Sequence, residues 1–260
     1  MTTPLLAPPP ENLQQLRHPL DRVSAGYKKE LLDTIENHAA NRPRNLQRSI
    51  GPSGLGNPCN RCLGYSLAEV PEKPGDSQWL TLQGTAMHTE LEHVFEKRNA
   101  VDPERWLTEE RLLVGAILGK DVTGSADLFD DYYGISLDWK LVGDNTITKA
   151  RKGSASETYI IQGHTYGVGH INAGRTVRNV AIAFLPRNAQ SIYEAVIKTF
   201  PHDPAIAAKA LKRANDIATL LASHGAHEVL SRLSNHPDCW DCKKNRQYTP
   251  DEARAMGYIQ

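Results

Sequence analysis

The four cysteines of this 260-residue chain form two Cys-x-x-Cys pairs, Cys59/Cys62 and Cys239/Cys242, with most of the sequence between them. Thiolates at this spacing are typical of metal sites, because they bind structural zinc and, in sets of four, iron–sulfur clusters. If all four bind one centre, the two ends of the core must meet in space. This requirement favours one compact domain closed by a metal–thiolate staple.

Charge and hydropathy exclude some classes of protein. Lys plus Arg equals Asp plus Glu, so net charge does not predict a polyanionic partner, and any nucleic-acid surface must be local. No apolar run is long enough to span a bilayer, and the N-terminus lacks the basic segment and apolar core of a secretory signal. We therefore expect no membrane association and a cytoplasmic location, where cysteines stay reduced and serve as ligands.

The hydrophobic pattern predicts a mixed α/β core with a mainly helical wrapping. Apolar positions at helical spacing predict helices over residues 20–40, 78–99, 156–173, 189–199, 203–224 and 228–234. Apolar or alternating runs predict strands over residues 111–115, 122–131, 135–142 and 179–185, with a tight turn at 132–134.

The domain organisation follows from composition. We expect residues 1–18 to be a flexible Pro-rich N-terminus, 19–245 to form a single domain, and 246–260 to form a polar C-terminal tail. Residues 50–58 are rich in Gly and Pro and are expected to form the loop that delivers Cys59.

Asp138 and Lys140 are two residues apart in an expected strand, so their side chains share one face. Asp127 lies on the preceding strand and can face them across the ladder. Converging carboxylates bind Mg²⁺ through oxygen, and such a metal activates water and neutralises charge that develops on phosphorus. Lys140 would position that water, and the backbone carbonyl of Trp139 would add an oxygen ligand.

Further candidates flank this pair. His88 lies on the upstream helix, four residues after Gly84, and an imidazole ligand indicates tolerance of Mn²⁺ beside Mg²⁺. Gln162 and Tyr166 are four residues apart on one helical face, where they would contact a phosphate or support Lys140. Glu110 is a further candidate ligand, although its spacing does not require that role.

Four motifs occur in order between the cysteine pairs: Gly84-x-x-x-His88, Gly124-x-x-Asp127, Asp138-x-Lys140 and Gln162-x-x-x-Tyr166. Together they resemble the RecB-type PD-(D/E)XK nuclease family, and the cysteine bracket resembles its iron–sulfur branch of Cas4 exonucleases and AddB-type nuclease domains. The resemblance implies a restriction-endonuclease-like α/β core with a mixed central sheet flanked by helices.

The same resemblance implies a metal site of His88, Asp127, Asp138 and Lys140, with the helix that carries Gln162 and Tyr166 beside it. It also implies Mg²⁺- or Mn²⁺-dependent exonucleolytic cleavage of DNA, often single-stranded. The expected setting is recombination, repair or mobile-element DNA processing, with recombination or replication proteins as further partners.

Alternatives stay open at two points. The cysteines are split two and two, whereas Cas4-like proteins pair one N-terminal cysteine with three C-terminal ones. A [4Fe–4S] cluster is expected from the nuclease context, and structural Zn²⁺ is the alternative. For the chain as a whole, the alternatives are a DNA-binding or assembly subunit that cuts nothing and a restriction-type endonuclease. The complete set of Asp127, Asp138 and Lys140 argues against the first, and no recognition insert is identified for the second.

Overall fold

The computed structural model describes residues 19–42, 50–73, 75 and 77–260, with side chains from Ser24 onward. The chain groups into two compact units, residues 1–47 with 76–82 and residues 48–75 with 83–260. In the first unit, the Glu36 carboxylate of α1 (Pro19–Ala40) accepts hydrogen bonds from the Ser77 hydroxyl and, at 2.8 Å, from the Gln78 N–H. Within the described ranges, every helix is too short or too polar to cross a bilayer.

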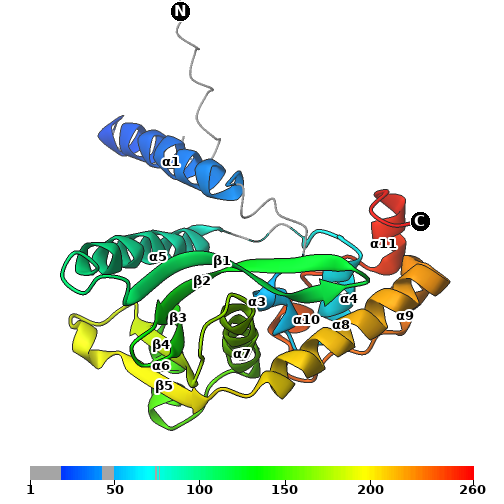
Figure 1. The fold of residues 1–260 in the computed structure, drawn as a ribbon. Helices are drawn as coiled ribbons and strands as arrows, with labels where there is room; N and C mark the ends of the chain where they lie inside the picture. The colour runs from blue at the N-terminus through cyan, green and yellow to red at the C-terminus, as the bar shows by residue number, and fades with distance from the viewer. Residues whose placement is uncertain (1–18, 43–49, 74, 76) are drawn as a thin grey trace, which may run out of the picture. The chain divides into compact units, whose positions relative to one another are not determined.

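A five-stranded sheet in the order β1-β2-β3-β4-β5 forms the centre of the second unit (Figure 1). The first three strands form an antiparallel meander, β4 pairs parallel with β3, and β5 pairs antiparallel with β4. The strands are β1 (Trp106–Ile117), β2 (Lys120–Asp130), β3 (Ile135–Val142), β4 (Asn179–Pro186) and β5 (Val196–Pro201). The parallel pair needs a crossover, which α6 (Asp144–Arg151) and α7 (Glu157–Asn172) provide.

Helices cover both faces of β3. On one face, Phe95 of α5 (Trp79–Arg98) stacks on Trp139 with ring centroids 5.7 Å apart. On the other face, α7 packs against β1, β3 and β4, and α8 (Pro204–His224) packs against α7 and β1. Strand β3 is therefore packed between α5 and α7.

Asp203 caps α8 by accepting a hydrogen bond from the Ala205 N–H at 2.9 Å, as the Asp-Pro sequence predicts.

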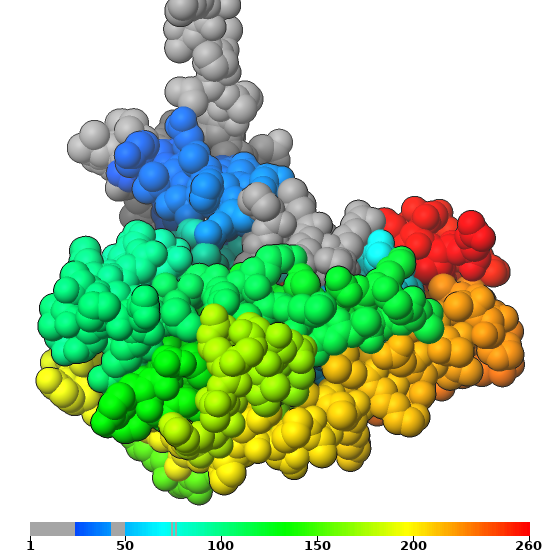
Figure 2. Space-filling model, in the orientation of Figure 1, coloured from blue at the N-terminus to red at the C-terminus, as the bar shows by residue number. Residues whose placement is uncertain are grey.

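The remaining helices gather at the end of the unit where both cysteine pairs lie. They are α3 (Pro52–Leu55), α4 (Asn60–Leu67), α9 (Ala226–Arg232), α10 (Trp240–Lys243) and α11 (Pro250–Ala255). Residues 246–260 carry α11, whose atoms adjoin those of α9 on the surface (Figure 2). Ala253 and Ile259 are buried there with Tyr65 and Leu230. This segment is polar by composition, but two of its apolar side chains complete a core cluster.

The structure confirms the predicted fold class: a mixed central sheet flanked by helices, with four cysteines drawn together. The helix expected over residues 189–199 is wrong. That segment contains a 3-10 turn, η2 (Ile192–Glu194), and then β5. Val196, Ile197 and Thr199 are β-branched, which favours a strand. Alternate positions, including Val196 and Phe200, pack against the core cluster that contains Phe184, so the period is two rather than 3.6.

Other elements differ from expectation mainly in length. The strand expected at residues 111–115 is the middle of the 12-residue β1. It is longer than expected because pairing with β2 extends the strand into a polar stretch of the sequence. The expected loop at residues 50–58 contains the short helix α3. The division of the chain at residues 18 and 245 stays a prediction.

Candidate active site and cysteine site

The antiparallel ladder between β2 and β3 opens at the two aspartates. The register pairs Leu128 with Leu137 and stops there, one position before Asp127 and Asp138. Beyond that point, β3 continues beside β4, and the Asp127 carboxylate accepts a hydrogen bond from the Trp139 N–H at 2.7 Å. A side chain thus replaces the missing strand partner, and both carboxylates lie at the opening.

Lys140 lies between Asp138 and α7. Its ammonium is 2.6 Å from Asp138 Oδ2 and donates to Gln162 Oε1 at 3.1 Å. It also lies over the Tyr159 ring, 5.0 Å from the centroid. Asp138 is only 2% exposed, so this is a buried ion pair in which the amide and the ring help to hold the cation.

Burial shifts the pKa values of this pair. Desolvation raises the pKa of Asp138 to about 6, because it outweighs the attraction of Lys140. Burial alone would lower the pKa of Lys140, but the negative charges of Asp138 and Asp127 and the hydrogen bond to Asp138 together outweigh it and raise that pKa. The pair is therefore charged at neutral pH, with a cation fixed beside a carboxylate that faces the opening in the ladder.

Beside the Asp138–Lys140 pair lies a second group of ionisable side chains, which includes two carboxylates and an imidazole. His88 Nδ1 of α5 lies 3.2 Å from Asp127 Oδ1 and 3.7 Å from Glu109 Oε1. One ligand atom from each of these three residues lies within 4.8 Å of the others. Burial opposes the charge on His88, but the two carboxylates more than offset it and raise the pKa of His88 to about 9. Oxygen and imidazole donors that attract a cation in this way suit Mg²⁺ or Mn²⁺.

The sequence did not identify Glu109. The β1–β2 register pairs Thr108 with Leu128 and Glu110 with Ala126, which puts Glu109 opposite Asp127. Glu109 has φ 46°, a conformation that L-residues rarely adopt and that no sequence pattern signals. Glu110, the candidate considered from the sequence, instead forms an ion pair with Arg175 at 2.8 Å.

The two α7 candidates have different surroundings. Gln162 contacts Lys140, whereas Tyr166, one turn further along, packs in a core cluster with Leu55 and Leu112. The Tyr166 hydroxyl approaches β2 so closely that a Cβ on Gly124 would lie 3.2 Å from it. Tyr166 thus anchors α7 against the sheet, and the glycine of the Gly124-x-x-Asp127 motif leaves room for that contact.

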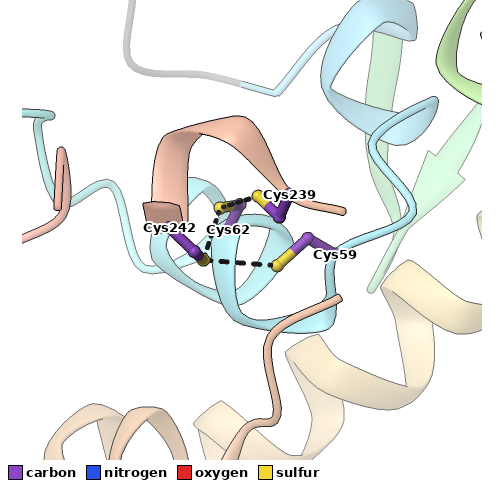
Figure 3. A group of neighbouring side chains, drawn as sticks. All are labelled: Cys59, Cys62, Cys239 and Cys242. Atoms are coloured by element: carbon purple, nitrogen blue, oxygen red, sulfur yellow. Dashed lines mark hydrogen bonds between the residues drawn. The ribbon is translucent and has the colours of Figure 1, made fainter. Parts of the chain in front are cut away.

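The four cysteines converge from two segments far apart in the chain, each of which carries one pair (Figure 3). Cys59 caps α4 and Cys239 caps α10, so each pair spans the start of a short helix. The Sγ atoms lie 3.5 Å apart for Cys62 and Cys239, and 3.7 Å apart for Cys62 and Cys242 and for Cys59 and Cys242. The backbone N–H of His236 donates to Cys59 Sγ at 3.4 Å.

All four sulfurs lie within 4.8 Å of one another. Burial raises the pKa of Cys62 and raises that of Cys242 to about 12, so several adjacent thiolates need a bound cation to be stable. These distances do not fit a [4Fe–4S] cluster. There each cysteine binds a different iron, which separates the sulfurs by about 6 Å.

No protein-family model matches the sequence, and no curated protein matches it. Among solved structures, one described as SSO0001 has 16% sequence identity, with 76% of this chain and 88% of that chain covered, and a TM-score of 0.47. An alkaline exonuclease (LHK-Exo) from Laribacter hongkongensis has 14% identity, with 71% and 92% covered, and a TM-score of 0.45. Its complex with dAMP gives a TM-score of 0.46. Similarity at this level is remote and does not fix what this chain binds or cleaves.

Proposed function

We propose that this chain is a divalent-metal-dependent DNA nuclease of the PD-(D/E)XK type. It would act as an exonuclease on single-stranded or end-containing DNA in recombination, repair or mobile-element DNA processing. The observation that carries the proposal is the buried Asp138–Lys140 pair at the opening of the β2–β3 ladder, beside Asp127 and His88. Ion pairs that serve stability alone have no need of a second acidic group next to them.

The donor set fits Mg²⁺ or Mn²⁺. The carboxylates of Asp127, Asp138 and Glu109 and Nδ1 of His88 would hold the ion, and the Trp139 carbonyl would be a further oxygen ligand. A bound ion supplies a water of lowered pKa and neutralises charge on the phosphate.

The chain itself supplies a fixed cation. The Lys140 ammonium is held by Asp138 and Gln162 before any substrate arrives, so it is oriented to donate to a water or a phosphate oxygen. Gln162 acts as a positioning residue because it contacts the ammonium, and Tyr166 supports it by fixing α7 against the sheet.

The test compares Asp138→Asn and Lys140→Ala with the unchanged protein on end-labelled single-stranded and double-stranded DNA in Mn²⁺ and in Mg²⁺. Both variants should lose cleavage by about a hundredfold or more. Lys212→Ala is the matched control, because Lys212 is an exposed lysine of α8 that forms an ion pair with the exposed Asp216 one turn away. Its cleavage should be unchanged. Circular dichroism and melting curves of each variant separate loss of catalysis from loss of fold.

Substrate form separates the three candidate functions. If linear DNA is degraded while circular DNA stays intact, the result supports the exonuclease. If circular DNA is cut to linear DNA, the result favours the restriction-type endonuclease instead. Binding of DNA by the unchanged protein with no cleavage in either metal would favour the assembly subunit and overturn the proposal.

A further inference from the structure

The spacing of the four cysteine sulfurs carries information about the metal that they bind. Zn–S bonds of about 2.3 Å place the sulfurs of a tetrahedral site about 3.8 Å apart. The three short separations here are 3.5, 3.7 and 3.7 Å. The remaining separations stay within 4.8 Å. The sulfurs therefore surround a volume suited to one ion.

An iron–sulfur cube would require this end of the unit to expand. Its irons and inorganic sulfides would separate the cysteine sulfurs to about 6 Å, which is about 2 Å more than the three short separations. The helix that holds Cys59 and Cys62 has little freedom to move, because α4 packs on α8 and α9. A Cβ on Gly64 of α4 would lie only 2.3 Å from the Leu233 side chain. Expansion would break this packing.

The surroundings of the sulfurs complete a closed site. Cys59, Cys62 and Cys239 are buried, and Cys242 is half-buried. The N–H of His236 reaches Cys59 Sγ, which is the kind of outer contact that orients a thiolate ligand. Four protein ligands with no open position are typical of a structural zinc site.

We propose that Cys59, Cys62, Cys239 and Cys242 bind a single Zn²⁺ ion in a tetrahedral tetrathiolate site, rather than a [4Fe–4S] cluster. The proposal is independent of the proposed nuclease activity, since it depends only on the sulfur positions and the packing around them. It departs from the cluster expected from the sequence.

The test uses the full chain, purified without oxygen from cells supplied with both iron and zinc. Metal analysis should give one zinc per chain and less than 0.1 iron, with no absorption band near 400 nm. The chain has four cysteines in all, so every thiol that reacts with a mercurial reports on this site. Titration should release one zinc per four thiols, and replacement by Co²⁺ should give the visible bands of a tetrahedral thiolate complex.

Other metal contents would overturn the proposal. About four irons per chain with absorption near 400 nm would show a cluster, and one iron per chain would show a single ion other than zinc. Four thiols that react freely in native, metal-free protein would rule out any metal site. None of these readouts uses DNA cleavage, so failure of the nuclease proposal and failure of this one are distinguishable.

Discussion

At the scale of single residues, two adjacent glutamates of β1 have different partners. Glu109 lies beside His88 and opposite Asp127, whereas Glu110 pairs with Arg175. In a regular strand these two adjacent side chains would only point to opposite faces of the sheet. The positive φ of Glu109 determines where its carboxylate lies. This conformation costs free energy at a non-glycine residue and is found most often at functional sites. We therefore assign Glu109 to the proposed metal site.

Glu109→Gln should weaken the dependence of cleavage on metal without removing the catalytic pair. Because the change removes one carboxylate from the donor set, we expect the Mn²⁺ concentration for half-maximal cleavage to rise about tenfold or more. The rate at saturating Mn²⁺ should fall much less. Metal titration of cleavage and calorimetry of Mn²⁺ binding measure the two effects.

The matched control is Glu90→Gln, which makes the same chemical change at an exposed position of α5, two residues from His88. Its metal titration should coincide with that of the unchanged protein. An unaltered titration for Glu109→Gln would remove Glu109 from the site, whatever the outcome for the aspartates.

At the scale of elements, two motif glycines have different physical roles. A Cβ on Gly124 of β2 would lie 2.5 Å from Pro52 Cδ, so this strand can pack on α3 only without a side chain there. A Cβ on Gly84 of α5 would have no described atom within 4 Å. The first glycine is thus required by packing, whereas packing in the described residues does not require the second.

The substitution Gly124→Ala should lower the free energy of unfolding by about 1 to 3 kcal/mol, because the proline ring cannot move aside. Gly84→Ala should raise it by about 0.5 to 1 kcal/mol, since alanine favours a helix interior over glycine. Urea unfolding of the two variants measures both changes. Equal stability of the two proteins would contradict the packing role of Gly124.

At the scale of the whole second unit, the cysteine site joins segments that no other covalent or metal link connects in the described residues. Cys62 and Cys239 are 177 residues apart, and the site joins the starts of α4 and α10. Closing a loop of this length in the unfolded chain costs about 5 kcal/mol of conformational entropy, which the proposed metal link would remove from folding. If the sulfurs bind one ion as proposed, the free energy of unfolding of the unit should depend on that ion.

Cys62→Ser should lower the free energy of unfolding by about 3 kcal/mol or more, because it removes a ligand and weakens the link. Ser66→Ala on the same helix is the control, and it should change the free energy of unfolding by only about a few tenths of 1 kcal/mol. Chemical unfolding with and without a strong zinc chelator measures the loss, and chelator should affect Cys62→Ser less than the unchanged protein. If Cys62→Ser matched Ser66→Ala, the link would not stabilise the fold.

Much of the architecture follows from short-range signals in the sequence. The turn after Asp130 and the Asp-Pro cap of α8 have short-range signals, and strand 135–142 was predicted with the bounds that the structure has. The resemblance of the four motifs implied that His88 and Asp127 lie near Asp138, and spacing along the strand put Asp138 and Lys140 on one face, where the structure pairs them. Segment 189–199 was wrong because its strand period appears only through pairing with β4.

The sequence by itself determined the mixed α/β class, the pairing of Asp138 with Lys140 on one face and the convergence of the four cysteines. Each of these follows from periodicity or from ligand spacing along the chain. Only the tertiary structure decided that Glu109 rather than Glu110 joins His88, because that choice depends on one backbone angle and on strand register. Likewise, residue spacing allowed either a cluster or a single ion at the cysteines. The packing of α4 against α9 limits how far Cys59 and Cys62 can move, and the proposal of a single ion rests on the resulting sulfur distances.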